Sequence, residues 1–385
     1  LLVVGLGLTT VNDLAIKFAL ANTNITTQSL ATASQRSFNN PLLDRQLAQY
    51  QLRCLQHGVP DILIVGSSRA LRGVNPEVLR RGLIDRGYAN PKIYNFGING
   101  ATAQIVDLVL RKLLTPQQLP KMVIWADGSR AFNSGRSDRT YDAIIASEGY
   151  QQLGSMSSVK TSNSSSLLQA QSSVKNTYQQ IDNQIDLKLA NISSAYHHRD
   201  RLKTWLQSKV PFASQINVAN DDTISNPDAP PNINDRSVDF DGFLAVKIQF
   251  DPNTYYQKYP KVAGDSDGDY ANFQLLGSQD RALQQVTSLL SAHKIPLVFV
   301  NVPLTNLYLD KFRRRHEKKF KQYMNKWMNS RQLTFDMDGF LKRQYDRFSD
   351  PSHLNQWGAS DVSNYLVQTR LISWQVLNPN QAIDR

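Results

Sequence analysis

The stretch Asp61–Ala70 reads DILIVGSSRA, and it decides how the rest of the chain is interpreted. Its four apolar residues, Ile62 to Val65, run directly into the small residues Gly66-Ser67-Ser68. A short continuous apolar run that ends in turn residues indicates a buried strand of a parallel sheet. Ligands bind outside the carboxyl ends of the strands in open α/β sheets. We therefore expect Ser68 to lie at a functional edge of the sheet.

The alternation of short apolar runs with helical patterns continues along the chain. Further strands are predicted over residues 92–96, 121–126, 296–302 and 333–337. Helices are predicted over residues 41–57, 76–86, 102–114, 281–294, 311–328 and 359–371. Strands that alternate with helices favour a parallel sheet covered on both faces. The sequence therefore predicts an α/β fold: a three-layer sandwich with a five-stranded parallel sheet of flavodoxin-like topology.

The alternation breaks over residues 133–239, a long polar region between the third and fourth predicted strands. It contains the low-complexity piece Ser155–Ser166, and residues 167–210 show scattered helical spacing. A structureless stretch of this length inside a compact core would be unusual. We interpret it as an inserted, partly helical lid or interaction region, so that residues 41–132 and 240–385 form the α/β domain.

Three polar residues far apart in the sequence form a candidate catalytic group. Ser68 follows the first strand, and Asp350 and His353 stand three residues apart in DPSHLNQWGA near the end of the chain. A serine hydroxyl needs an adjacent base to become a nucleophile, and imidazole suits neutral pH. A carboxylate must hold the imidazole in the right tautomer and stabilise its cation. We expect Asp350 and His353 to lie in a loop that starts a helix and to face the edge that carries Ser68.

Each of these residues also has a plainer interpretation. Ser67 and Ser68 suit the N-cap of the following helix, because serine is a preferred capping residue. Asp350-Pro351 suits an ordinary helix start, with the aspartate as cap and the proline in the first turn. His353 alone would be a structural histidine. The order of the three residues at predicted strand ends is what favours the catalytic interpretation.

Acyl transfer also needs donors for the oxyanion. The amide of Ser68 is one candidate. The amide of Gly100 is another, because a residue without Cβ lets the backbone approach a substrate closely. Gly100 lies in NFGINGAT, directly after the second predicted strand.

These blocks resemble those of the SGNH (GDSL-type) hydrolase superfamily, over residues 61–127 and about 281–371. The serine in GSSR resembles that of the membrane-associated bacterial branches, which include alginate-acetyltransferase-like proteins and the D-alanyl-transfer protein of teichoic acid synthesis. The resemblance implies that Ser68 is the nucleophile, that Gly100 is an oxyanion donor and that Asp350 and His353 complete a triad. It also implies a serine esterase or O-acyltransferase that acts on acyl groups of a cell-envelope polysaccharide.

One block departs from the family pattern. The family has Gly-x-Asn-Asp after the third strand, where the Asn side chain is a third oxyanion donor. This chain has Asp127-Gly128-Ser129-Arg130-Ala131-Phe132-Asn133, so Ser129 stands where the Asn is expected. Ser129 is the candidate third donor, with Arg130 or Asn133 as substitutes. The alternative function is a catalytically inactive SGNH-like subunit that binds glycan or scaffolds a membrane complex.

The N-terminal 40 residues are assigned to a membrane anchor or signal remnant and a polar linker. Leu1–Val11 is apolar, but Asp13 and Lys17 interrupt it, and a span needs about 20 apolar residues. The first residue is Leu rather than Met, so we expect the true start to lie upstream. A packing helix is the alternative. With the family resemblance, the anchor places the protein on the extracytoplasmic, periplasmic side of a bacterial membrane, with other membrane-complex subunits as partners.

The charge balance points to anionic partners. The 385 residues carry a net charge of +11, and the pI is about 9.6. Five cations in the predicted helix 311–328 form a candidate patch for an acidic glycan or anionic headgroups: Arg313, Arg314, Arg315, Lys318 and Lys319. The plainer alternative is a solvated helix face. Because basic residues are not interleaved with aromatic ones in a nucleic-acid module, we predict no DNA or RNA binding.

The sequence predicts neither a metal nor a cofactor. The single cysteine, Cys54, excludes an intrachain disulfide, and the spacing of His and Cys offers no zinc motif. Asp265–Asp269 resembles the start of a calcium loop. Tyr270 replaces the glycine that an EF-hand needs next, and Leu276 stands where a bidentate Glu would close it. We therefore favour a turn of acidic residues.

Overall fold

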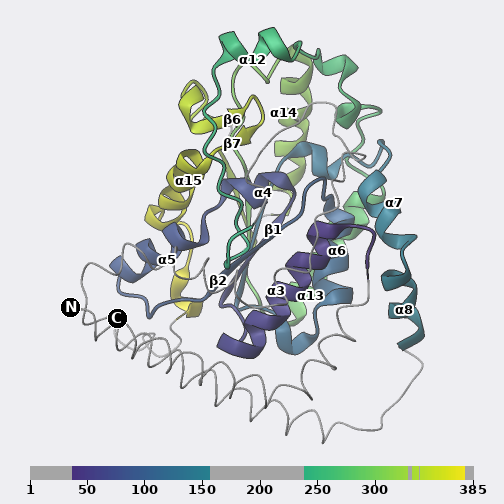
Figure 1. The fold of residues 1–385 in the computed structure, drawn as a ribbon, viewed down its shortest axis with the longest axis vertical. Helices are drawn as coiled ribbons and strands as arrows, with labels where there is room; N and C mark the ends of the chain where they lie inside the picture. The colour runs from purple at the N-terminus through teal and green to yellow at the C-terminus, as the bar shows by residue number, and fades with distance from the viewer. Residues whose placement is uncertain (1–36, 157–237, 328–331, 338, 378–385) are drawn as a thin grey trace, which may run out of the picture. The chain divides into compact units, whose positions relative to one another are not determined.

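The computed structural model describes residues 37–156, 238–327, 332–337 and 339–377 (Figure 1). The predicted anchor and most of the predicted insertion lie outside these residues. The chain divides into two compact units, and the described part of the smaller one is residues 37–39 and 146–156. There the amide of Gly149, in helix α8 (Glu148–Met156), donates to the carbonyl of Ser37 at 3.0 Å. The larger unit, residues 40–145 and 198–385, contains the sheet.

The larger unit is an α/β fold built on a five-stranded, all-parallel sheet. The strands lie in the order β2-β1-β3-β4-β5. Their bounds are β1 (Ile62–Gly66), β2 (Ile93–Gly97), β3 (Met122–Asp127), β4 (Leu297–Asn301) and β5 (Gln332–Asp336). The four strands β1 to β4 are buried along their whole length, as continuous apolar runs predict. All five predicted strands are confirmed to within two residues at each end.

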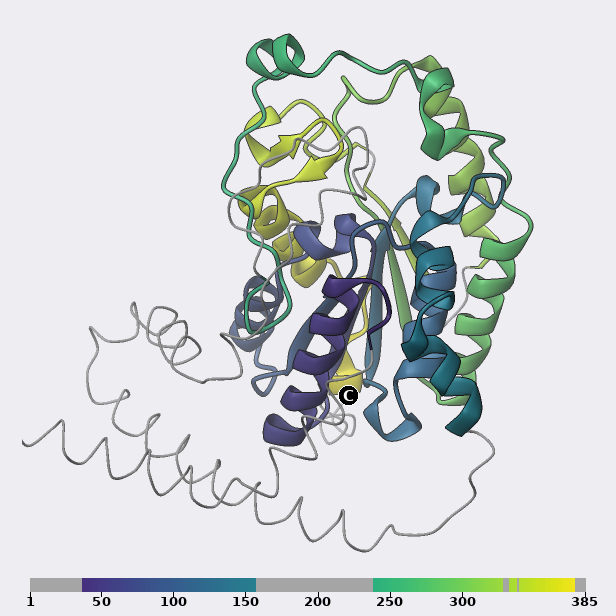
Figure 2. The same cartoon turned by 45° about the vertical axis from the view of Figure 1, so that its right-hand side comes forward.

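Helices cover both faces of the sheet (Figures 1 and 2). On one face, strand residues such as Ile64 and Val298 join a core with α5 (Pro76–Asp85) and α15 (Gln356–Gln368). The other face carries α3 (Pro41–His57), α6 (Ala103–Leu108), α13 (Ser278–Ala292) and α14 (Lys311–Asn325). The other described α-helices of this unit are α4 (Ser68–Gly73), α7 (Arg139–Ile145) and α12 (Pro252–Lys258).

Aromatic side chains fill the second face. Tyr50 of α3 packs edge-to-face on Tyr94 and Phe96 of β2, with ring centroids 5.3 and 5.7 Å apart. Further along the sheet, Trp125 lies 5.2 Å from Phe132. Because each fully buried aromatic ring removes a large apolar area from water, these contacts fix α3 and the segment after β3 on the sheet.

Side-chain caps set where the helices begin. α3 keeps its predicted bounds, because Asn40 accepts the amide of Leu43 at 2.9 Å and Pro41 occupies the first turn. α15 starts three residues earlier than predicted, because Asn355 caps it through the amides of Trp357 and Gly358. The predicted helix 102–114 is α-helical only to Leu108 and continues as a π-helical turn.

Two small elements at the carboxyl edge of the sheet were not predicted. α4 begins at Ser68, directly after β1. Asp350 and His353 do not lie in a loop that opens the last helix. They belong to an antiparallel hairpin of β6 (Phe348–Asp350) and β7 (His353–Leu354), in which Asp350 pairs with His353. Strands of two or three residues are too short for periodicity to reveal.

Candidate functional site

The turn between β1 and α4 is built on a glycine. Gly66 has φ +137°, and a Cβ there would lie 2.2 Å from the carbonyl oxygen of Ala126. Only glycine fits this position. Ser67 is the N-cap of α4, and its hydroxyl accepts the amide of Arg69 at 3.2 Å. Ser68 therefore occupies the first helical position, with its hydroxyl free of the capping role.

Asp127, at the carboxyl end of the neighbouring strand β3, clamps this turn. Its Oδ2 accepts the amide of Ser67 at 2.9 Å, and its Oδ1 accepts the hydroxyl of Ser67 at 2.9 Å and the amide of Gly128 at 3.0 Å. Burial raises the pKa of Asp127 to about 6, against the charge of Arg69 and these hydrogen bonds. Asp127 is not among the predicted site residues. An acidic residue at the end of a predicted strand is the only local signal, and it does not reveal that β3 lies next to β1.

The structure brings Ser68, His353 and Asp350 into contact. The Oγ of Ser68 lies 2.8 Å from Nε2 of His353, and Nδ1 of His353 lies 2.9 and 3.0 Å from the two carboxylate oxygens of Asp350. Ser68 is half-buried, whereas His353 is 7% and Asp350 3% exposed. A carboxylate can only accept at neutral pH, so Nδ1 carries the proton and Nε2 is left to accept the serine hydroxyl. The predicted meeting of the three side chains is confirmed.

The plainer interpretation is confirmed for Ser67, which caps α4, but it is wrong for Ser68 and Asp350. Ser67, not Ser68, caps the helix after β1. Asp350 caps no helix, because α15 begins at Gln356 and Asn355 is its cap. Ser68 and Asp350 instead both form hydrogen bonds with the imidazole of His353.

Burial favours the neutral imidazole of His353, and the surrounding positive groups keep the carboxylate of Asp350 ionised. Burial opposes ionisation of Asp350, but His353, Arg72 and the Ser352 amide hold its pKa well below its usual value. Nη1 of Arg72 lies 4.0 Å from Oδ2 of Asp350, and the Ser352 amide donates to Oδ1 at 2.8 Å. Burial lowers the pKa of His353, Asp350 opposes the change, and Arg72 and Arg130 add to it. At neutral pH the imidazole is therefore an available base.

Contacts from another strand end hold the hairpin in place. Thr305, which lies beyond β4, donates from its hydroxyl and its amide to the carbonyl of Pro351, at 2.7 and 3.2 Å. Asn355 donates to the carbonyl of Phe348 at 3.0 Å. These bonds fix the backbone on both sides of Asp350 and His353, so the imidazole meets Ser68 without rearrangement.

The two backbone amides predicted as oxyanion donors are those of Ser68 and Gly100. The Ser68 amide is the first of α4, and the first amides of a helix have no intrahelical partner. Gly100 is exposed and has φ +73°, and a Cβ there would lie 2.6 Å from the hydroxyl of Thr140. The hydrogen bonds among the described residues use neither amide. Both predicted backbone donors are therefore unoccupied.

The prediction that Ser129 is the third oxyanion donor is wrong. Ser129 is fully buried, and its hydroxyl donates its only proton to Oε1 of Glu317 at 2.6 Å. Asn133 is committed as well, because its Nδ2 donates to the carbonyls of Asp269 and Ala271 at 3.0 and 2.9 Å. Of the three polar side chains considered after β3, only Arg130 keeps donors that these bonds do not use.

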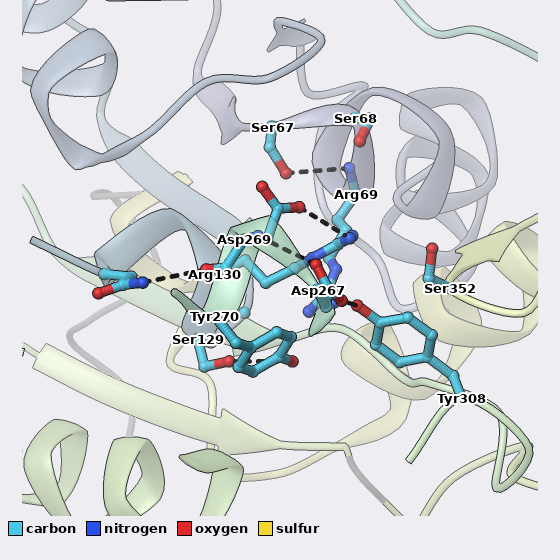
Figure 3. Close-up of polar contacts among 12 residues, drawn as sticks. Ser67, Ser68, Arg69, Ser129, Arg130, Asp267, Asp269, Tyr270, Tyr308 and Ser352 are labelled. Carbon is cyan, nitrogen blue, oxygen red and sulfur yellow. Dashed lines mark hydrogen bonds and ion pairs between the residues drawn. The ribbon is translucent and has the colours of Figure 1, made fainter. Parts of the chain in front are cut away.

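Arg130 lies in a network of charged and aromatic side chains in the region of Ser68 and Ser352 (Figure 3). Its Nη1 donates to Oδ2 of Asp269 at 3.1 Å, and its guanidinium lies 5.5 Å from the centroid of the Tyr308 ring. Tyr308 in turn donates to Oδ2 of Asp267 at 3.0 Å. These contacts fix the orientation of a cation whose charge reaches His353.

The acidic segment Asp265–Asp269 binds arginines. Nη2 of Arg313 lies 2.9 Å from Oδ2 of Asp267, and Asp269 pairs with Arg130 and Arg136 at 3.1 and 2.7 Å. Within the described ranges, no group of three or more His, Cys, Asp or Glu side chains could hold a metal. The acidic-turn interpretation therefore fits these residues.

The predicted anionic-partner patch on α14 is one residue too large. Arg313 is 2% exposed and is paired with Asp267 and Asp310, because it lies on the face of α14 that packs inward. The other four cations of the patch are exposed: Arg314, Arg315, Lys318 and Lys319. The exposed stripe is thus compatible with an anionic partner but does not include Arg313.

Comparison with known proteins assigns no family. No family model matches the chain, and no curated protein matches it in sequence. In the part of the chain that the structure describes, no helix combines the length and apolarity needed to cross a membrane. The fold and the site define the class on their own: an α/β protein with a Ser-His-Asp constellation at the carboxyl edge of a parallel sheet.

Proposed function

We propose that this protein is a serine esterase or O-acyltransferase with an SGNH-type, three-layer α/β sandwich. The observation that carries the proposal is the hydrogen-bonded chain from Ser68 through His353 to Asp350. The strand order 2-1-3-4-5 is that of flavodoxin-like folds. The place of the serine after β1 and of the Asp-x-x-His pair just before the last long helix also supports it.

The chemistry follows from the hydrogen bonds. Nε2 of His353 takes the proton from Ser68 as its Oγ attacks the carbonyl carbon of an acyl ester. Asp350 stabilises the imidazolium that forms. The amides of Ser68 and Gly100 donate to the oxyanion, and each such donor contributes about 10²–10³ in rate. His353 then protonates the departing alcohol oxygen, and an acyl-serine remains.

The second half of the reaction decides between the two activities. His353 removes a proton from the incoming nucleophile, which attacks the acyl-serine and releases Ser68. Water as nucleophile gives an esterase, and a sugar hydroxyl gives an O-acyltransferase. Both share the same acyl-enzyme, so the same residues serve either outcome.

We assign the substrate to the acyl groups of a bacterial cell-envelope polysaccharide, handled outside the cytoplasm by a membrane-tethered protein. The assignment of the substrate and of the location is supported by the family resemblance and by the apolar N-terminal stretch. The net charge of +11 and the exposed cations of α14 fit an anionic surrounding such as an acidic glycan or lipid headgroups. Other subunits of a membrane complex are further partners.

A fluorophosphonate probe tests the proposal, because it reacts with a serine only where a base activates it. We expect labelling of the wild type, no labelling of Ser68→Ala, and unchanged labelling of the control Ser360→Ala. Ser360 bonds only within α15, to the carbonyl of Gln356 at 2.8 Å. Absence of labelling in the wild type across pH 6 to 9 would reject the enzyme and leave the inactive, glycan-binding subunit.

A further inference from the structure

Arg69, the residue after Ser68, is a buried cation with unused donors. Its residue exposure is 2%, and none of its three side-chain nitrogens has a hydrogen-bond partner among the described residues. Its Nη1 lies against the backbone of Gly128, where a Cβ would come within 1.7 Å. An unpaired buried donor is destabilising, and more so when it is charged. Such a group calls for a functional explanation.

The neighbouring carboxylates bind other donors, and none of them accepts a hydrogen bond from Arg69. Asp127 binds the Ser67 turn, and Asp269 binds two other arginines. Asp267 accepts from Arg313 and from Tyr308. The negative charges nearby compensate the charge of Arg69, but its hydrogen-bonding capacity is not used.

Arg130 extends toward the same group of side chains. Figure 3 shows Arg69 and Arg130 reaching toward Asp267, Asp269 and Tyr308, near the turn that carries Ser68. The hydrogen bonds of Arg130 engage only its Nη1, so its Nε and Nη2 remain. Unlike the nitrogens of Arg69, those two nitrogens are not completely shielded from solvent, while Arg130 as a whole is 8% exposed.

We propose that Arg130, with the charge of Arg69 behind it, binds a carboxylate of the substrate beside Ser68. A guanidinium matches a carboxylate with two parallel hydrogen bonds. The substrate class is then an ester that carries a carboxylate, either on the alcohol, as in an acylated uronic acid, or on the acyl group. This inference rests on the proposed function, because it places the carboxylate next to an ester held at Ser68.

The proposal predicts a substrate preference that one residue controls. A charge-assisted hydrogen bond to a bound carboxylate corresponds to about 10- to 100-fold in kcat/KM. We expect this preference mainly in KM, because the carboxylate does not react. Lysine keeps the charge of Arg130 but not its paired donors, so Arg130→Lys is expected to retain only part of the preference.

Matched esters measure the preference. On the alcohol side, 4-acetoxybenzoate is compared with its neutral methyl ester; on the acyl side, 4-nitrophenyl hemisuccinate is compared with 4-nitrophenyl acetate. We expect one anionic ester to be preferred at least tenfold by the wild type, and the preference to collapse in Arg130→Gln. Arg136→Gln is the control, because it removes the same charge from the same partner, Asp269, and should keep the preference.

The result that overturns the inference is a wild type that hydrolyses the neutral esters without preferring either anionic one. Retention of the preference in a folded Arg130→Gln variant also overturns it. Failure of the proposed function has a different appearance, because then no ester is turned over. Calorimetric titration of the Ser68→Ala variant with both matched pairs of esters gives a readout without turnover. Tighter binding of the anion is expected in one pair, and equal binding in both pairs rejects the carboxylate site.

Discussion

Two serines at the same edge of the sheet have opposite environments. Ser68 follows β1, and its hydroxyl meets the imidazole of a hairpin near the end of the chain. Ser129 follows β3, and its hydroxyl is buried against Glu317 of α14. Both follow a glycine or a small-residue turn at a strand end. Whether such a serine is reactive or structural depends on which side chain the fold places against its hydroxyl.

The turns differ in what holds them as well. The backbone after β1 is clamped by Asp127 through bonds to Ser67, which leaves Ser68 unengaged except by His353. The segment after β3 is held through its own side chains, since Ser129 and Asn133 both donate into the surrounding structure. The turn after β1 is therefore held through Ser67, the neighbour of Ser68. The segment after β3 is held through the side chain of Ser129 itself.

Removal of the Ser68 hydroxyl gives the largest expected effect. Ser68→Ala and His353→Ala should each lower kcat/KM for 4-nitrophenyl acetate by at least about 10⁴-fold, because members of a triad act as a unit. The double variant should be little worse than either single one. Independent, multiplying losses in the double variant would show that Ser68 and His353 do not act in the same step.

The second-largest effect on activity is expected from weakening the hydrogen bonds between Asp127 and the turn at Ser67. Asp127→Asn should lower kcat by about 10- to 100-fold, because the amide of Ser67 loses its acceptor and the position of Ser68 becomes less defined. Substrate KM should change little, since Asp127 is buried beneath the turn. Steady-state kinetics on the neutral ester decide this, and an unchanged kcat would remove Asp127 from the positioning role.

The same substitution changes stability in a pH-dependent way. The folded-state pKa of Asp127 is raised to about 6, above its unfolded value near 3.9. Its contribution to stability is therefore complete below about pH 4 and is lost as the pH rises through 6. Relative to the wild type, Asp127→Asn should gain stability between pH 4 and 7, by up to about 3 kcal/mol. Denaturant unfolding at several pH values measures this difference, and a constant difference would contradict it.

Protonation of His353 should have a smaller effect on kcat/KM over the accessible pH range. Burial and two arginines lower the pKa of His353, so kcat/KM should stay level down to about pH 6.5 and fall tenfold per unit below the depressed value. Asp350 is ionised throughout, because its pKa is far lower. The pH profile of the wild type tests this. A midpoint above 6.5 would mean that the carboxylate outweighs burial.

Structural features that depend on residues close together in the sequence could be predicted. Continuous apolar runs ending in turn residues predicted all five strands, and Asn40 with Pro41 fixed the start of α3. Ser68, Asp350 and His353 could be predicted because their residue types and order fit one reaction. Asp127 could not be, because its role depends on β3 lying next to β1, which the sequence does not state.

The failures share a physical cause. Ser129 is diverted by Glu317, 188 positions away, and Arg313 by Asp267, 46 positions away. Such partners depend on which faces of α14 pack inward, and a run of cations does not reveal which of them is buried. The role of a polar residue that suits both a buried, paired environment and an exposed one therefore depends on the tertiary structure and cannot be predicted from the sequence.

The smallest effect on activity is expected at the second serine. Ser129→Ala should change kcat/KM by less than about threefold, because its hydroxyl donates to Glu317 and not to a substrate. It should cost about 1–3 kcal/mol of stability, since Oε1 of Glu317 keeps only the donor Tyr270 and its Oε2 has no partner among the described residues. Kinetic and denaturant-unfolding measurements on the same preparation distinguish the effect on activity from the effect on stability. A loss of 10²–10³ in kcat with little change in stability would instead return Ser129 to the oxyanion site, and the contrast with Ser68 would disappear.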